Sequence, residues 1–443
     1  MIKCAMESEG ILTDVSAEEL KLIKEGLTII NPKWDIASRM NKSLWGVPEK
    51  LKYFKNASGA SIIVPIGYVD ILQKAFPDMA VTDNRLTHPL TYKIPFNGTL
   101  YDYQQDAVKD MLLHSNGVLC AITGSGKTAM MIYMLTELQQ KTLILVHTIE
   151  LANQFISSLV KFTDLKKDDI GFIGSGKKDI KDITVGLLQT VTMMDAQILN
   201  DNFGAVFVDE VHIAPADTYA EAISLLKAKY KYGASGTPER ADGLTKVIFW
   251  LTGALRHIVP QAKLGSVIIK PTVRVIETKY RYPLFDTSEY QDMISDLSTN
   301  FDRNTLILQT LADYPTQQVV MLCQRVEQVE LLQLSVPGSV ILTSDMGKKA
   351  RASVMKGLLD GTHRVVISTY QLFSTGIDVP TLEVLFMCAP IKSNVKVRQS
   401  AGRLMRVTPL LPNKQPIIVD FADKQVELLK HQWYQRSRIL RTL

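Results

Sequence analysis

The segment at residues 121–128 constrains the fold of this chain most, because it places a glycine-rich loop between a strand and a helix. Its sequence is AITGSGKT. The residues before it, GVLC at 117–120, are apolar and predict a buried strand, whereas AMMIYML at 129–135 predicts a helix. This strand–loop–helix order is typical of a phosphate-binding loop in a parallel α/β sheet.

The residue types in this loop suit a triphosphate. Small residues allow backbone N–H groups to surround the anion, and the following helix presents its positive end to it. We therefore expect Lys127 to reach the outer phosphates and the Thr128 hydroxyl to ligate Mg²⁺. The other expected cradle residues are Thr123, Gly124, Ser125 and Gly126. The usual first glycine is Ala121 here, and a glycine-rich turn that binds nothing is the alternative.

A second apolar run ends in two adjacent carboxylates. Residues 205–208 read AVFV and are followed by Asp209 and Glu210. A carboxylate at a strand end can hold Mg²⁺, a role that we assign to Asp209. Its neighbour can polarise an attacking water, a role that we assign to Glu210. The pairing predicts hydrolysis rather than transfer to an acceptor, although by itself it is also common in solvated turns.

A third motif, QSAGRLMR at residues 399–406, carries two arginines. At this spacing Gln399, Arg403 and Arg406 are predicted to share roughly one face of a helix. Guanidinium groups neutralise charge on a transferred phosphoryl group, so we expect both arginines to act as arginine fingers. A basic helix face without a catalytic role is the alternative. An arginine supplied from a second lobe would make hydrolysis depend on lobe closure.

Apolar strand-like runs alternate with helical stretches over most of the chain, which predicts two doubly wound parallel sheets. We expect an N-terminal α+β accessory domain at residues 1–90, a first lobe at 91–263 and a second lobe at 264–443. The predicted strands include 142–146, 183–188 and 205–208 in the first lobe, and 318–323, 339–343, 364–368, 384–388 and 416–419 in the second.

In this order, the three motifs resemble those of superfamily 2 helicases and translocases. The resemblance runs from about residue 100 to about residue 406, and its DEVH box at 209–212 differs from the DEAD box of RNA helicases. It implies two tandem RecA-like lobes that use ATP and Mg²⁺, with Gln399 among the catalytic residues. It also implies that Gln104, in LYDYQ at 100–104, contacts adenine, with Gly376 near the phosphates and Asp378 near the ribose.

The same resemblance implies nucleic-acid contact or coupling in several short motifs. These are LVHTIELANQ at 145–154, LLQT at 187–190, SGTP at 235–238 and STY at 368–370. The residues given these roles are Thr148, Gln189, Thr190, Ser235, Thr237, Arg325 and Thr369. Each motif alone is an ordinary strand followed by a polar turn, and their common order is what indicates the superfamily.

The first ninety residues precede every motor motif. Basic and aromatic residues alternate between positions 33 and 55: Lys33, Trp34, Arg39, Lys42, Trp45, Lys50, Lys52, Tyr53, Phe54 and Lys55. Lysines for phosphates and flat rings for bases are typical of a nucleic-acid surface. Rings buried in a small core, with lysines in solvent, are the alternative. A small leader before a compact motor is similar to phage branch-migration helicases, above all to a T5-like phage member.

Charge and cysteine use narrow the class further. The net charge is +5, but residues 391–443 carry eleven Lys/Arg against three Asp/Glu, a balance of +8. A basic C-terminal end suits phosphate contacts, and a solvated terminal helix is the alternative. Four scattered cysteines without a C-x-x-C pair indicate a reducing compartment, and the three that lie in apolar strand-like runs are expected to be core residues. No apolar run is long enough to span a bilayer, so we expect a cytoplasmic protein, in the host cytoplasm if phage-encoded.

These observations predict an ATP-driven DNA helicase that remodels branched DNA, such as forks, Holliday junctions or R-loops, in recombination, repair or replication. An RNA helicase of the same superfamily is one alternative. A nucleotide-gated scaffold that binds DNA without turnover is another. We expect branched or forked DNA as the partner, no membrane association and, because no heptad pattern is visible, a monomer.

Overall fold

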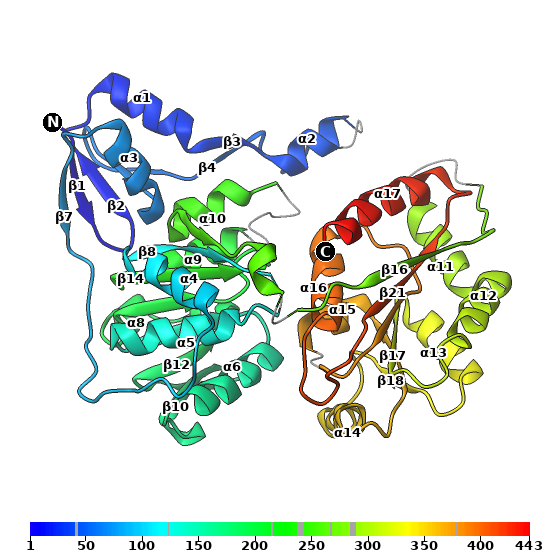
Figure 1. Ribbon diagram of the computed structural model, residues 1–443. Helices are drawn as coiled ribbons and strands as arrows, with labels where there is room; N and C mark the ends of the chain where they lie inside the picture. Colours follow the sequence, from blue (N-terminus) through cyan, green and yellow to red (C-terminus); the bar gives the residue numbers. More distant parts are fainter. Residues whose placement is uncertain are drawn as a thin grey trace. The chain divides into compact units, whose positions relative to one another are not determined.

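The computed structural model describes residues 1–39, 43–122, 124–213, 216–236, 243–265, 268–283, 289–376 and 379–443. These residues form two compact units (Figure 1). The first unit contains Met1–Ala121 and Gly126–Val259, and the second contains Pro260–Leu443 together with Ile122–Ser125. Each unit is built on its own large sheet.

An N-terminal subdomain opens the first unit. Its sheet has the order β5-β6-β2-β1-β7, in which β1 and β7 are parallel and the other neighbours are antiparallel. The strands are β1 (Lys3–Met6), β2 (Gly10–Thr13), β5 (Lys55–Asn56), β6 (Ile62–Val64) and β7 (Ala80–Asp83), and a separate pair is β3 (Thr28–Ile30) with β4 (Lys50–Lys52). The helices are α1 (Ala17–Gly26), α2 (Pro32–Arg39) and α3 (Val69–Ala75), with a 3-10 turn η1 (Ile66–Tyr68).

The first lobe follows with an eight-stranded sheet of order β11-β10-β12-β9-β13-β14-β8-β15, parallel except between β10 and β11. The strands are β8 (Asn116–Cys120), β9 (Thr142–Val146), β10 (Ile170–Gly174), β11 (Lys177–Asp179), β12 (Ile183–Leu187), β13 (Ala205–Val208), β14 (Tyr230–Ser235) and β15 (Leu255–Ile258). The helices are α4 (Asp102–Leu112), α5 (Lys127–Leu138), α6 (Ile149–Phe162), α7 (Leu188–Val191), α8 (Ala196–Asn200), α9 (Ala216–Leu225) and α10 (Thr245–Thr252). Every residue of β8, β9 and β13 is buried, as expected for strands covered on both faces.

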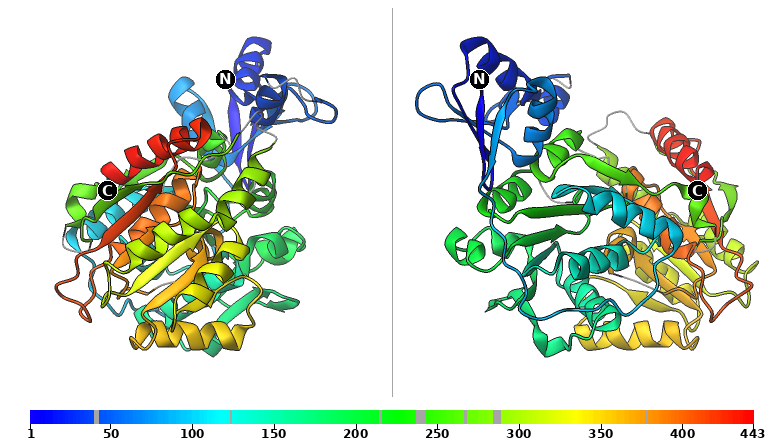
Figure 2. Two further views of the ribbon diagram at one scale, coloured as in Figure 1. Left: turned by 90° about the vertical axis from the view of Figure 1, so that its right-hand side faces the viewer. Right: turned by 60° about the vertical axis from the view of Figure 1, so that its left-hand side comes forward.

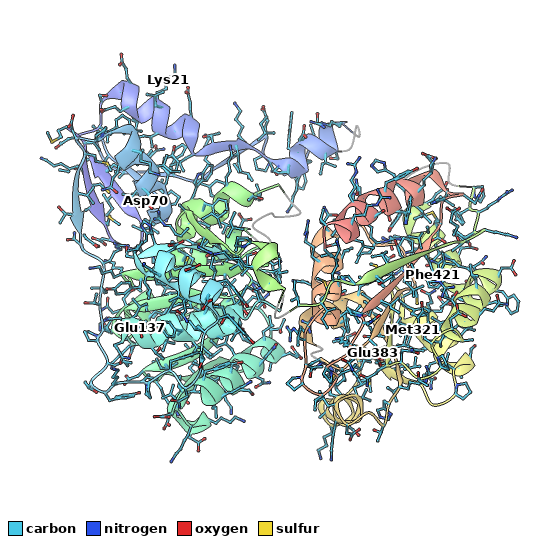
Figure 3. The ribbon with its side chains drawn as sticks, viewed as in Figure 1. Lys21, Asp70, Glu137, Met321, Glu383 and Phe421 are labelled. Atoms are coloured by element: carbon cyan, nitrogen blue, oxygen red, sulfur yellow. The ribbon has the colours of Figure 1, made fainter. Side chains whose placement is uncertain are left out.

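The second unit has a fully parallel sheet of order β16-β21-β20-β17-β19-β18. The strands are β16 (Thr272–Glu277), β17 (Val319–Cys323), β18 (Val340–Leu342), β19 (Val365–Thr369), β20 (Val384–Met387) and β21 (Ile417–Ala422). The helices are α11 (Tyr290–Thr299), α12 (Phe301–Leu311), α13 (Val326–Ser335), α14 (Lys348–Leu359), α15 (Tyr370–Gly376), α16 (Asn394–Leu404) and α17 (Glu427–Arg441). Met321 of β17 and Phe421 of β21, labelled in Figure 3, are fully buried in this core.

The predicted α/β class with two parallel sheets is confirmed. The predicted strands at 142–146 and 205–208 coincide with β9 and β13, and the one at 416–419 is longer, because β21 continues to Ala422. The three cysteines expected in the core, Cys120, Cys323 and Cys388, are buried, and so is Cys4, for which no such expectation was made. In the described part of the chain, no helix is both long enough and apolar enough to cross a membrane.

The ribbon of the N-terminal subdomain lies directly against the first lobe (Figure 2), and the two share one hydrophobic core. Tyr53 and Tyr68 of the subdomain meet Trp250 of α10 edge to face, with ring centroids 5.7 and 5.9 Å apart. Gly67 permits this close approach, since a side chain there would overlap the backbone of α10. Asp70, labelled in Figure 3, forms an ion pair with Arg256. The subdomain is therefore packed onto the lobe rather than tethered to it.

Candidate active site

The carboxyl ends of three neighbouring strands gather the candidate residues of the first unit. Ala121 follows β8, Asp209 follows β13, and Ser235 ends β14, which lies between them. The Ala121 N–H donates to the Ser235 carbonyl at 2.9 Å, which ties two of these ends together. Parallel strands present their carboxyl ends at one edge, where α/β sheets bind ligands.

The loop before α5 has the geometry of an anion cradle. Gly124 and Gly126 adopt φ values of +94° and +80°, a region that favours glycine. The backbone N–H and hydroxyl of Ser125 both donate to the Ile122 carbonyl, at 3.1 and 2.7 Å. Gly126 is the N-cap of α5, so the loop leads directly into the positive end of that helix. Thr123 lies outside the described residues.

Lys127 is bound to a carboxylate in this structure. Its Nζ donates to the Ala121 carbonyl at 3.1 Å and lies 3.2 Å from Oε1 of Glu210. Glu210 Oε2 accepts from the Gly236 N–H at 3.3 Å and lies 3.3 Å from Nδ1 of His212. The same His212 nitrogen lies 2.8 Å from the Ser235 hydroxyl. A continuous polar chain therefore runs from the cradle lysine to the end of β14.

The two adjacent carboxylates have different electrostatic environments. Burial, and then the charge of Glu210, raise the pKa of Asp209 to about 7. Burial opposes ionisation of Glu210 as well, but Lys127 and His212 outweigh it and hold the pKa of Glu210 below its usual value. Among the described residues no ion pair involves Asp209, whose Oδ1 accepts from the Glu210 N–H at 3.0 Å. Asp209 is therefore the carboxylate whose ionised form a bound cation would stabilise most.

The backbone at Glu210 is held in an unusual conformation. Its φ is +52°, in the left-handed region that non-glycine residues rarely adopt. The Val211 N–H bonds the Ala234 carbonyl at 3.1 Å, and the Glu210 carbonyl accepts from Ile213 N–H at 2.9 Å. Backbone strain of this kind persists where neighbouring contacts fix it, and it is concentrated at functional sites.

Gln104 lies beside Gly126 at the end of the loop. It is buried at the start of α4, where Oε1 accepts from the Tyr101 N–H at 3.0 Å and Nε2 donates to the Tyr103 hydroxyl at 3.3 Å. A side chain at Gly126 would overlap its amide. Tyr101, which is 52% exposed, stacks on Tyr103 with centroids 5.8 Å apart and 6° between planes. Tyr101 is not among the residues predicted from the sequence, although the aromatics around Gln104 in LYDYQ were the available signal.

The first-unit residues predicted to contact nucleic acid have different surroundings. The Thr148 hydroxyl accepts from the Leu151 N–H at 3.3 Å and so caps α6. Gln189 is exposed on α7, and Thr190 beside it is half-buried. Ser235 is fully buried, with its hydroxyl 2.8 Å from Nδ1 of His212. A buried hydroxyl cannot contact nucleic acid directly, so of its two predicted roles only coupling remains a proposal. Thr237 lies outside the described residues.

The second unit holds the two arginines, and here one prediction is wrong. Gln399 and Arg403 belong to α16, but that helix ends at Leu404, and Arg406 instead forms a β-bridge with Ile268. Arg406 therefore does not share a helix face with the other two. Gln399 is buried, and Arg403 Cζ lies 5.9 Å from the centre of the Phe373 ring.

The remaining second-unit positions end or begin regular elements. Thr369 is the last residue of β19 and Gly376 the last of α15. Arg325 precedes α13 and donates from Nη2 to Oε1 of Gln291 at 2.6 Å. Asp378 lies outside the described residues.

Comparison with known families agrees with this geometry. Residues 97–240 match the family described as "Type III restriction enzyme, res subunit", and residues 302–408 match "Helicase conserved C-terminal domain". The chain belongs to the superfamily 2 helicases, which are ATP-dependent enzymes. The predicted resemblance is therefore confirmed.

Several individual helicases are similar in sequence over most of the chain. It is 27% identical to "Putative ATP-dependent RNA helicase L396" of Acanthamoeba polyphaga mimivirus, over 96% of this chain and 82% of the relative. It is 23% identical to "DNA 3'-5' translocase XPB2" of Sulfurisphaera tokodaii, over 73% and 82%. It is 26% identical to "Probable helicase D10" of Escherichia phage T5, over 69% of this chain and 68% of the relative. This similarity agrees with the predicted resemblance to a T5-like phage member.

A solved structure supports the fold. The chain of S. cerevisiae Dbp5, solved with RNA and ADP BeF3, is similar with a TM-score of 0.59 and 15% identity, over 79% of this chain and 88% of that one. The tandem RecA-like arrangement expected from the sequence agrees with this likeness.

Proposed function

We propose that this helicase hydrolyses ATP with Mg²⁺ while moving on DNA, and that it remodels branched DNA such as forks, four-way junctions or R-loops. The observation that carries the proposal is the position of the Glu210 carboxylate. It contacts Lys127 of the cradle and accepts from the N–H of Gly236, the second residue of the coupling motif at 235–238. One side chain thus connects the phosphate loop to a segment whose motif is typical of coupling to nucleic acid.

The residues present fit ATP and Mg²⁺. The cradle leads into a helix N-terminus. The pKa of the buried Asp209 is raised, and a bound cation would lower it again by stabilising the ionised carboxylate. Thr128 and Asp209 would hold the metal, which keeps most of its ligands as water and phosphate oxygens and neutralises phosphate charge when bound. Lys127 would leave Glu210 for the outer phosphates. Glu210 is then released to orient the attacking water and accept its proton.

The coupling step follows from the same contact. When Lys127 turns to the phosphates, Glu210 loses one partner while Gly236 and His212 keep their bonds to it. A change at the phosphates therefore reaches the end of β14 through a single carboxylate. We assign Arg403 and Arg406 the role of arginine fingers, with Gln399 beside them, and Gln104 with Tyr101 the contact to the adenine.

The C-terminal helix supports contact with phosphates. α17 exposes Glu427, His431, Tyr434, Gln435, Arg438 and Arg441, whereas Leu429, Trp433, Arg436 and Leu440 are buried. Glu427 lies in the first turn and pairs with Lys430, so the exposed charges at the other end of the helix are the two arginines, which suit a nucleic-acid backbone. The relative named as a DNA translocase supports DNA, and the one named as an RNA helicase supports RNA as the second candidate. We further propose that the protein acts as a monomer and, because relatives are viral, in the host cytoplasm.

Phosphate release with different nucleic acids tests the proposal. We expect turnover to rise on adding DNA, most with forked, four-way or R-loop substrates, less with linear duplex, and to fall with increasing salt. The variant Lys127→Ala should remain folded and lose turnover. Equal turnover with and without nucleic acid would refute the motor, and stronger stimulation by a matched structured RNA would favour the RNA helicase. No phosphate release on any substrate would leave a nucleotide-gated scaffold.

A further inference from the structure

Residues 28–39 and 43–52 of the N-terminal subdomain form an arm without a core of its own. β3 and β4 pair antiparallel, with Thr28 opposite Lys52, and α2 lies at their far end (Figure 1). In the described parts of the arm, 28–39 and 43–52, Asn31 is the one buried residue. Two strands and a short helix gain little stability from burial of this extent. Another interaction must therefore fix the shape of the arm.

Asn31 provides that interaction by joining the two sides of the arm. Its N–H donates to the Glu49 carbonyl and its Nδ2 to the Pro48 carbonyl, both at 2.8 Å. Its Oδ1 accepts from the Lys33 N–H at 3.0 Å, at the start of α2. The single buried Asn31 side chain and backbone thus fix the start of α2 against residues 48 and 49. The arm is therefore ordered there, although most of its side chains lie in solvent.

The arm exposes apolar side chains that nothing in the described chain covers. Ile30, Ile36 and Trp45 are 60%, 57% and 93% exposed, and Trp45 is the most exposed large apolar side chain of the described residues. Trp45 occupies the corner of a turn in which the Val47 N–H bonds the Leu44 carbonyl at 3.0 Å. Scattered exposed apolar residues are ordinary, but several on one coreless segment indicate a surface with a partner.

The charges on the arm identify the chemistry of that partner. Lys33, Lys50 and Lys52 are exposed, whereas Arg39 is paired with Asp35 at 2.9 Å. Glu49 is the one exposed acid in the described parts of the arm. Exposed lysines and an exposed indole on the same arm fit a polyanion with flat apolar faces. An unpaired nucleic-acid strand has both, whereas a paired duplex hides the faces of its bases.

We propose that the arm binds single-stranded DNA, with Trp45 stacked on an unpaired base and Lys33, Lys50 and Lys52 on the flanking phosphates. The proposal deepens the proposed function, on which it rests, because a motor on branched DNA meets unpaired bases where strands separate. The arm would hold one strand at that point. The sequence showed the mixture of rings and lysines, but the exposure of Trp45 decides which ring is free to stack.

Binding of a labelled single-stranded oligonucleotide to the full-length protein without ATP tests the stacking. Trp45→Ala should weaken the affinity about ten-fold, since one base–aromatic stack is worth roughly 1–3 kcal/mol, and Trp45→Phe should weaken it less. Leu334→Ala, at an 80% exposed apolar residue of α13, is the matched control and should bind like the unaltered protein. Unchanged affinity of Trp45→Ala would overturn the proposal.

Intrinsic fluorescence gives an independent measurement. An unlabelled single strand should quench tryptophan emission of the unaltered protein and of Trp34→Phe, but much less that of Trp45→Phe. Self-association that depends on Trp45, seen by sedimentation without DNA, would overturn the proposal in favour of a second copy. Both experiments omit ATP, so they are independent of the motor activity. If neither shows an effect of Trp45 while DNA still stimulates ATP turnover, the role of the arm is refuted and the proposed motor function is not.

Discussion

Among the buried ion pairs of the described residues, one from each unit can be compared, and the two differ in how completely they are enclosed. Lys127 and Glu210 lie at the carboxyl edge of the first-lobe sheet, with side chains 9% and 14% exposed. Arg303 and Asp423 in the second unit are 0% and 1% exposed. Arg303 donates from Nε and Nη2 to the two carboxylate oxygens, at 2.8 and 3.0 Å, and from Nη1 to the Cys388 carbonyl at 2.6 Å.

The difference shows how the same kind of charge pair can serve two purposes. A forked guanidinium satisfied on every side fixes the position of the elements that carry it, here α12 and the end of β21. A lysine makes a point contact without fixed directions, and at an open sheet edge it can exchange one anion for another. We infer that the sealed pair maintains structure and that the edge pair changes partners during turnover.

The largest expected effect is on stability, in the sealed pair. Arg303→Met should lower the free energy of unfolding by roughly 3–5 kcal/mol, because Asp423 would be left buried with its charge uncompensated. Urea denaturation followed by circular dichroism measures the change. The double variant Arg303→Met with Asp423→Leu should recover much of the loss. A single variant as stable as the unaltered protein would show that this pair does not hold the second unit together.

The edge pair should behave in the opposite way. Glu210→Gln should reduce DNA-stimulated ATP turnover about 100-fold or more, as loss of a catalytic base does. It should lower the free energy of unfolding by roughly 1–2 kcal/mol, less than Arg303→Met does, because the amide oxygen can still accept from Lys127 or from the Gly236 N–H, although not from both. Turnover and urea denaturation of the same sample test both statements. A large loss of stability with normal turnover would reverse the comparison.

A buried lysine outside these two pairs should have a smaller, pH-dependent effect on the free energy of unfolding. Lys231 on β14 is 1% exposed, and its Nζ donates to the Ser8 carbonyl of the N-terminal subdomain at 3.0 Å and to the Ile223 carbonyl at 3.3 Å. Burial first, and then Arg85, lower the pKa of Lys231 to about 7, against the opposing charge of Glu9. Between pH 7 and the ordinary value of 10.5, the unfolded chain therefore binds the extra proton.

Because the unfolded state binds more protons there, the contribution of Lys231 to stability rises with pH above about 7. The stability of the unaltered protein relative to Lys231→Met should increase by about 2 kcal/mol from pH 7 to pH 9. Urea denaturation at several pH values measures this difference. Lys246→Met, at an exposed lysine of α10, is the control and should show no such trend. A constant difference for Lys231→Met would mean that this lysine stays charged in the fold.

Local sequence patterns predicted the strands, and the loop between a strand and a helix at residues 117–135, well. The run at 142–146 became β9 because five consecutive apolar or β-branched residues can be buried on both faces of a parallel sheet. The helix after the loop starts at Lys127, directly after the glycine that permits the turn. These features depend on residues adjacent in the chain, whose conformational preferences do not require knowledge of distant partners.

The helix that carries the arginines illustrates where such reasoning fails. The spacing of Gln399, Arg403 and Arg406 allowed one continuous helix face. Arg406 instead pairs with Ile268, and the Ile269 N–H donates to the Met405 carbonyl at 2.7 Å. A backbone bond to a distant segment thus ended the helix at Leu404. Nothing within the motif itself encodes that partner.

The sequence by itself determined the class of protein, the glycine-rich loop between a strand and a helix, and the acidic pair directly after a strand, because each depends on spacing within a few residues. Only the tertiary structure decided that Glu210 contacts Lys127, that Ser235 is buried on His212, and that Trp45 is exposed while Trp250 lies in the core. Strand order brings β8, β14 and β13 side by side although they are far apart in the chain. Which side chains meet at a sheet edge, and which remain in water, is set by that long-range packing and not by local preference.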